Sequence, residues 1–166
     1  VLLAEGFEGY TSLSQLTSSG NWNNYFQSSN LALDTTTFFG GLKSLRQRMP
    51  QTTGEVSNSI VKVISPDLDE VYIRAYLRWQ PTFSGVNSGH DAIRISANYT
   101  GPGTRPSGTD FFLVNIENSN YRGEGQPGYT NAYVYHPEQN DAYGEHWYPS
   151  GFTSNGTGPD GGFGSF

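Results

Sequence analysis

The chain has 166 residues, a formal net charge of -6 and no cysteine, which fits one domain over 1–166 that buries a core without disulfides. The negative balance argues against nucleic acid as a partner, because phosphate recognition calls for a basic surface. No run approaches the ~18 apolar residues of a membrane span, so we expect no membrane partner.

Short alternating runs, separated by Gly, Pro, Asn and Ser, dominate the chain and predict an all-β protein. The expected strands cover 2–8, 22–27, 30–36, 43–49, 55–65, 70–79, 91–98, 110–117, 130–136 and 145–148. Only 12–16 (SLSQL) is typical of a helical turn. Repeated strands with one apolar and one polar face predict two antiparallel sheets packed as a concanavalin A-like β-sandwich or jelly roll.

Five of the nine basic residues occupy one parity of three predicted strands: Arg46, Arg48, Arg74, Arg78 and Arg94. Side chains alternate between the two faces of a strand, and the opposite parity of these strands is mainly apolar. Tyr72, Tyr76 and His90 share the arginine parity. If the strands share a sheet, this surface, the predicted arginine face, suits an extended anionic or polyhydroxylated ligand. The alternative is a solvated outer face with cation-π contacts.

The next strands extend this pattern. We expect the strand at 110–117 to direct Phe112, Val114 and Ile116 into the core. Asn115 then lies on the predicted arginine face, and the strand at 130–136 adds Tyr133 and Tyr135. Trp79 has core parity, whereas Trp147 stands in a strand flanked by loops and is the best candidate for stacking on a sugar ring.

Metal ligands are not specifically indicated. The segment 135–149 concentrates His136, Glu138, Asp141, Glu145 and His146, but their spacing matches no metal motif, and a polar loop is the preferred interpretation. Calcium would suit oxygen ligands near strand ends. The candidates have low specificity: Glu5, Glu8, Asp67, Asp69, Asp141 and Asp160. We therefore predict no required cofactor and no particular metal site.

The runs VYIRAYLRWQPTF (71–83) and GHDAIRIS (89–96), the Tyr-x-Tyr strand at 133–135 and the ending GGFGSF (161–166) resemble one family. They resemble the concanavalin A-like sandwiches of secreted polysaccharide lyases, with alginate and glucuronan lyases nearest. The resemblance implies a secreted protein that acts on a uronate-containing polysaccharide. It also implies further closing strands, so the Gly-rich stretch 150–166, which has no strand pattern, predicts an incomplete sandwich. A first residue other than Met is typical of a removed signal peptide.

Elimination at a uronate requires a group that neutralises the carboxylate, a base for the C5 proton and an acid for the leaving oxygen. Arg74, Arg78 or Arg94 could neutralise the carboxylate, and His90 could be the base. Tyr133 or Tyr135 could be the acid. Hydrolysis of a glycoside needs two carboxylates across the sugar, and Glu117, Glu138 and Glu145 form no same-face pair.

Two alternatives belong to other functional classes. The first is a non-catalytic glycan-binding module that uses the same predicted arginine face. The second is an extracellular structural subunit that self-associates, with the apolar run 1–7 or the C-terminal stretch completing a neighbour's sheet. Strand addition of this kind requires an unpaired sheet edge.

Overall fold

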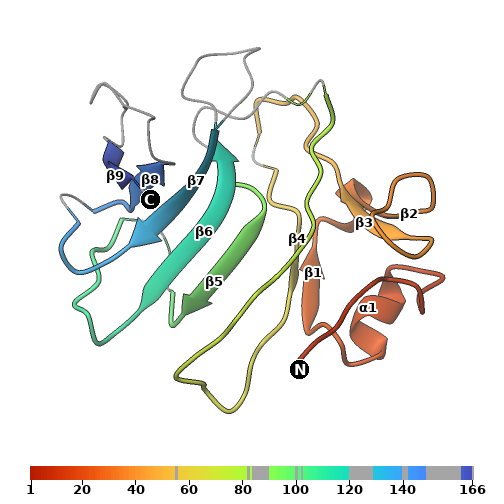
Figure 1. Cartoon of the computed structure of the whole chain (residues 1–166), viewed down its shortest axis with the longest axis horizontal. Coiled ribbons are helices and arrows are strands. Elements are labelled where there is room, and N and C mark those ends of the chain that lie inside the picture. Colours follow the sequence, from red (N-terminus) through yellow and green to blue (C-terminus); the bar gives the residue numbers. More distant parts are fainter. Residues whose placement is uncertain are drawn as a thin grey trace. The chain divides into compact units, whose positions relative to one another are not determined.

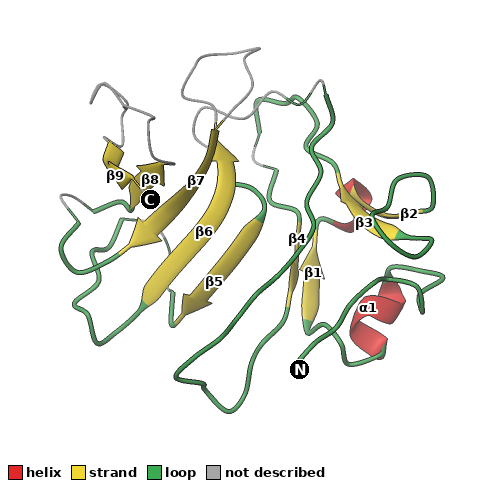
Figure 2. Ribbon diagram, viewed as in Figure 1, coloured by secondary structure: helices red, strands yellow, loops and turns green. Residues whose placement is uncertain are grey.

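The computed structural model describes residues 1–54, 56–81, 83, 90–99, 101, 103–119, 129–139, 142–148 and 162–165. The chain forms two compact units, 1–76 and 77–166, and each is described by itself. In both units the regular secondary structure of the described residues is mostly strand, with almost no helix, and loops connect the strands (Figures 1 and 2). The all-β prediction is confirmed, whereas the sandwich and the single domain stay predictions.

The first unit contains two small antiparallel pairs. Strand β1 (Asn24–Phe26) pairs with β4 (Ser59–Val61), and β2 (Leu31–Asp34) pairs with β3 (Ser44–Gln47). The 3-10 turn η1 (Ser28–Asn30) lies between β1 and β2.

The expected helical turn is present as α1 (Ser14–Ser18). The Gln15 carboxamide accepts a hydrogen bond from the Ser12 backbone N–H at 3.2 Å, which holds the residues before the helix against its first turn. Leu16 is fully buried and anchors the turn.

The predicted strand at 2–8 is wrong. Phe7 has a φ of 63°, and this left-handed conformation cannot continue a strand. The Glu5 carboxylate instead accepts hydrogen bonds from the Phe7 backbone N–H at 2.6 Å and from the Trp22 indole at 3.1 Å. A local acceptor therefore replaces the strand partner that the alternating pattern predicted.

The predicted strand at 70–79 is also absent, although its alternation is the clearest in the sequence. Its expected core row is not buried, because Ile73 and Leu77 are 49% and 44% exposed. The opposite row is exposed as well, including Tyr72 and Tyr76. Alternation describes how a segment could pair, but a strand exists only where a neighbouring backbone supplies the ladder.

The second unit contains one five-stranded sheet in the order β5-β6-β7-β8-β9 (Figure 1). Its strands are β5 (Ile93–Ala97), β6 (Phe112–Ser119), β7 (Tyr129–Tyr135), β8 (Glu145–Tyr148) and β9 (Gly162–Ser165). The first four are antiparallel, and β9 runs parallel to β8. The expectation of no strand in 150–166 is therefore wrong at 162–165, because two glycines in four residues leave no alternation to detect.

The predicted core row of β6 is reversed. Phe112 and Ile116 are 44% and 41% exposed, whereas the alternate row is buried. That buried row consists of Phe111, Leu113, Asn115 and Glu117. Parity shows which residues share a face but not which face is covered. The covered face packs Phe111 and Leu113 with Tyr133, Tyr135 and Tyr99.

Candidate functional site

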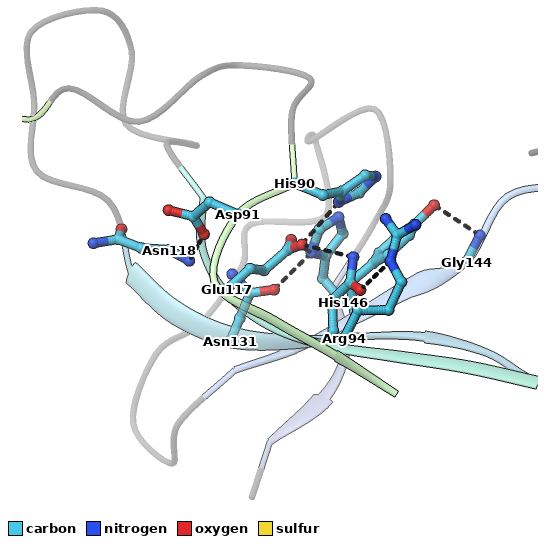
Figure 3. Close-up of polar contacts among 10 residues, drawn as sticks. His90, Asp91, Arg94, Glu117, Asn118, Asn131, Gly144 and His146 are labelled. Atoms are coloured by element: carbon cyan, nitrogen blue, oxygen red, sulfur yellow. Dashed lines mark hydrogen bonds and ion pairs between the residues drawn. The ribbon is translucent and has the colours of Figure 1, made fainter. Parts of the chain in front are cut away.

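The register of the sheet aligns four polar residues across four neighbouring strands. Arg94 of β5 lies opposite Asn115 of β6, Asn115 opposite Tyr133 of β7, and Tyr133 opposite His146 of β8. Residues opposite one another in a ladder share a face. We refer to this surface as the polar face, and it consists of Arg94, Asn115, Glu117, Asn131, Tyr133 and His146. Figure 3 shows Arg94, Glu117, Asn131 and His146 of this face.

Arg94 is the exposed member of this row. Its guanidinium Nε donates a hydrogen bond to the Asn115 Oδ1 at 2.9 Å, and its Cζ lies 5.7 Å from the centroid of the Tyr99 ring. Asn115 is 1% exposed, so a buried amide orients an accessible cation. With Nε held in this way, the terminal nitrogens have the fork geometry that binds carboxylates.

Glu117 contacts two imidazoles. Its side chain is fully buried, Oε2 lies 2.8 Å from the His90 Nδ1, and Oε1 lies 3.4 Å from the His146 Nδ1. The Asn115 Nδ2 also donates to Oε2, at 3.4 Å. Burial raises the pKa of Glu117 above its ordinary value, and the hydrogen bond to His90 only partly offsets this effect.

These contacts determine which nitrogen carries the proton in each neutral imidazole. An ionised Glu117 can only accept a hydrogen bond, so its contact with the His90 Nδ1 favours the tautomer with the proton on Nδ1 and the lone pair on Nε2. The His146 Nδ1 faces the Asn131 Oδ1 at 2.8 Å, which selects the same tautomer. The two residues differ in access, since the His90 side chain is 34% exposed and that of His146 is 2% exposed.

The Tyr133 ring contacts both imidazoles. Its centroid lies 4.3 Å from that of His90, in a stacked arrangement, and 4.6 Å from that of His146. The Tyr133 hydroxyl oxygen accepts a hydrogen bond from the Gly144 backbone N–H at 3.0 Å (Figure 3). In this contact the hydroxyl oxygen is the acceptor and the backbone N–H is the donor.

Gly144 must be a glycine for this contact to form. A Cβ at this position would lie 2.7 Å from the Val134 carbonyl oxygen, 2.7 Å from the Tyr135 ring and 2.9 Å from the Tyr133 Cζ. Any side chain would therefore push the turn away from both tyrosines.

Asp91 fixes the segment that carries His90. Its Oδ1 accepts from the Asn118 backbone N–H at 2.6 Å, and its Oδ2 accepts from the Trp79 indole at 2.7 Å. Burial raises the pKa of Asp91, and these two hydrogen bonds act in the opposite direction. Through its hydrogen bond to Asp91, Trp79 contacts the segment that carries His90.

Tyr135 lies on the same face of β7 as Tyr133, and both rings belong to the buried core. Tyr135 is 2% exposed and meets the Tyr99 ring edge-on, with centroids 5.5 Å apart. Burial, together with the adjacent Tyr135, raises the pKa of Tyr99 to about 12, and Arg94 acts in the opposite direction. Of the two tyrosines predicted as acids, Tyr133 is the one that contacts His90.

The other predicted site residues lie in the first unit or elsewhere in the second unit. Arg46 and Arg48 belong to the first unit, as do Tyr72, Arg74 and Tyr76. Arg78 is exposed in the segment before the sheet. Trp147 pairs with Ala132, on the face opposite His146, and its ring meets His136 at a centroid distance of 6.4 Å. The five arginines are therefore not one cluster within either unit.

Sequence reasoning missed the parts played by Glu117, Asn131 and His146. Glu117 and Asn131 have the parity of Asn115 and Tyr133, so alternation already placed them on the same faces of their strands. His146 had no such signal, because β8 is only four residues long. Within the described ranges, no group of three or more His, Asp or Glu residues could hold a metal ion.

No family model, curated protein or solved structure matches this chain. The described residues include no helix that is long and apolar enough to cross a membrane.

Proposed function

We propose that the protein is a secreted polysaccharide lyase that cleaves a uronate-containing polysaccharide by β-elimination, on a concanavalin A-like sandwich. The observation that carries the proposal is the proximity of three groups that this reaction needs. These groups are the Arg94 guanidinium, the His90 imidazole and the Tyr133 hydroxyl. In the sheet register, Asn115 lies between Arg94 and Tyr133. The His90 ring stacks on the Tyr133 ring, with centroids 4.3 Å apart.

The proposed reaction gives each residue one role. Arg94 binds the substrate carboxylate and stabilises the negative charge that develops when C5 loses its proton. The His90 Nε2 accepts that proton. The electron pair forms the C4–C5 double bond, the C4–O4 bond breaks, and the Tyr133 hydroxyl protonates O4. The products are a new hydroxyl end and an unsaturated uronate.

Hydrolysis is a weaker interpretation of the same residues. A glycosidase places two carboxyl groups on either side of the scissile bond. Glu117 is fully buried, and its Oε2 is engaged by His90. Glu145 is also buried and binds the His136 Nε2 at 2.8 Å. Neither carboxyl group has access to a sugar ring, whereas His90 and Arg94 do.

The test is to incubate the protein with alginate, polyglucuronate and pectate and to follow the absorbance of the unsaturated uronate. We expect an absorbance rise with at least one of these polymers. The rise should fall by about 10²–10⁴-fold in His90→Ala and in Tyr133→Phe, as expected for the loss of a proton-transfer group. No absorbance rise on any uronate polymer would reject catalysis.

A non-catalytic glycan-binding module is the second candidate. It is favoured by a pair of exposed aromatic rings in the first unit, Phe39 and Tyr76, which stack with their centroids 3.7 Å apart. Flat exposed rings of this kind can pack against sugars. This function predicts retention on an immobilised polysaccharide without any product, and weaker retention in Tyr76→Ala and Arg74→Ala.

A further inference from the structure

We propose that Glu117 is a positioning residue that holds His90 in the Nδ1–H tautomer, so that Nε2 is the basic atom presented on the polar face. The relevance of this tautomer to catalysis rests on the proposed function. The tautomer itself is a property of the folded protein and is measurable without any substrate.

The contacts of Glu117 explain why this residue controls His90 in particular. The ionised carboxylate is acceptor-only, and its Oε2 lies 2.8 Å from the His90 Nδ1. Among the described residues, the contact with Glu117 is the hydrogen bond that the His90 imidazole makes. His146 differs, because its Nδ1 lies 2.8 Å from the Asn131 Oδ1 and 3.4 Å from Glu117. Loss of Glu117 should therefore release His90 but leave His146 held by Asn131.

A purely structural role fits Glu117 less well. Its Oε1 is buried and, among the described residues, has no hydrogen-bond partner. A buried carboxylate with an unsatisfied oxygen reduces stability relative to a well-packed neutral side chain. A residue that costs stability but orients an accessible imidazole is typical of a functional site.

His136 provides an internal control. Its Nε2, rather than its Nδ1, faces a carboxylate, that of Glu145, at 2.8 Å. The chain has three histidines, so one spectrum reports on all of them. We expect His90 and His146 to be Nδ1–H tautomers and His136 to be the Nε2–H tautomer.

The experiment is a long-range ¹H–¹⁵N correlation spectrum of the full chain at a pH where the imidazoles are neutral, with Glu117→Leu and Glu117→Gln as variants. Leucine removes both acceptor oxygens, so we expect His90 to switch to the Nε2–H tautomer. Glutamine keeps one acceptor oxygen, so His90 should remain Nδ1–H. His136 and His146 should be unchanged in both variants, which shows that the fold is intact.

Three results would overturn the proposal: an Nε2–H tautomer for His90 in the wild type, an Nδ1–H tautomer for His90 in Glu117→Leu, or equal changes in the two variants. Glu145→Gln is the matched control, because it makes the same substitution beside His136 and should leave His90 unchanged. If the tautomers behave as expected but no polymer is cleaved, the positioning stands and the proposed function fails. If both stand, Glu117→Leu should lose nearly as much activity as His90→Ala, and Glu117→Gln should lose less.

Discussion

Arg94 and Asn115 face each other across the β5-β6 ladder, and the Arg94 Nε donates to the Asn115 Oδ1 at 2.9 Å. Asn115 is buried and Arg94 is exposed, so the amide orients a cation that a ligand can reach. In the proposed function, this oriented cation binds the substrate carboxylate.

The first prediction concerns this pair. Arg94→Lys should weaken binding of an acidic oligosaccharide about 10-fold or more. An ammonium group cannot donate to Asn115 and also form a bidentate pair with a carboxylate. Titration calorimetry with an oligouronate would measure the change. Arg105→Ala is the control, because Arg105 is exposed and donates to the Pro137 carbonyl. Equal losses in the two variants would indicate general electrostatic attraction instead of a specific site.

The second prediction concerns Gly144. Gly144→Ala should lower the free energy of unfolding by about 1–3 kcal/mol, because the new methyl group overlaps with both tyrosine rings and a backbone carbonyl. Urea denaturation would measure this loss. Gly40→Ala is a suitable control, since a Cβ at Gly40 meets no atom within 4 Å. A stable Gly144→Ala protein would show that the turn has another conformation.

The third prediction concerns pH. Burial raises the pKa of Glu117 above its ordinary value of 4.5, so the folded state holds this proton more tightly than the unfolded state does. The carboxyl group therefore contributes stability below pH 4.5, and this contribution is lost as the pH rises through the folded pKa. Glu117→Gln has no such loss, so its stability relative to the wild type should increase over this pH range.

Urea denaturation at a series of pH values would measure the difference between Glu117→Gln and the wild type. Glu138→Gln serves as the control for the lost charge, because Glu138 is exposed. A difference that decreases as the pH rises would show that the ionised form of Glu117 is stabilised in the fold. That result would contradict the dominance of burial over the hydrogen bond to His90.

The fourth prediction concerns substrate stereochemistry. The stacked rings of His90 and Tyr133 lie side by side, so a base and an acid placed there approach a sugar from the same side. This arrangement favours elimination when the C5 hydrogen and O4 are on the same side of the ring, as in glucuronate and mannuronate. We expect faster cleavage of polyglucuronate than of pectate, whose galacturonate units have them on opposite sides. The reverse order, measured by absorbance, would reject these roles.

Strand alternation predicted much of the second unit. The strands at 91–98, 110–117, 130–136 and 145–148 are present, with shifts at their ends. Alternation also placed His90, Arg94, Asn115 and Tyr133 on common faces of their strands. It could not show that these faces are buried beside aromatic rings, because coverage depends on contacts between residues far apart in the sequence.

The first unit was harder to predict. The strand expected at 70–79 has a perfect alternation but no partner in the ladder, and the arginine pattern depended on it. Backbone conformation at single residues, such as Phe7, also leaves no trace in a hydrophobic pattern. Hydrogen bonds that the Glu5 carboxylate accepts then determine the path of the chain.

The Tyr133 ring contacts the imidazoles of His90 and His146 at centroid distances of 4.3 and 4.6 Å. The ring current of a phenol shields protons that lie above its plane. Carbon-bound protons of the stacked His90 imidazole should therefore resonate upfield of their usual positions. The His136 ring meets the Trp147 ring edge-on. The stack thus provides a natural chemical-shift label for the proposed base.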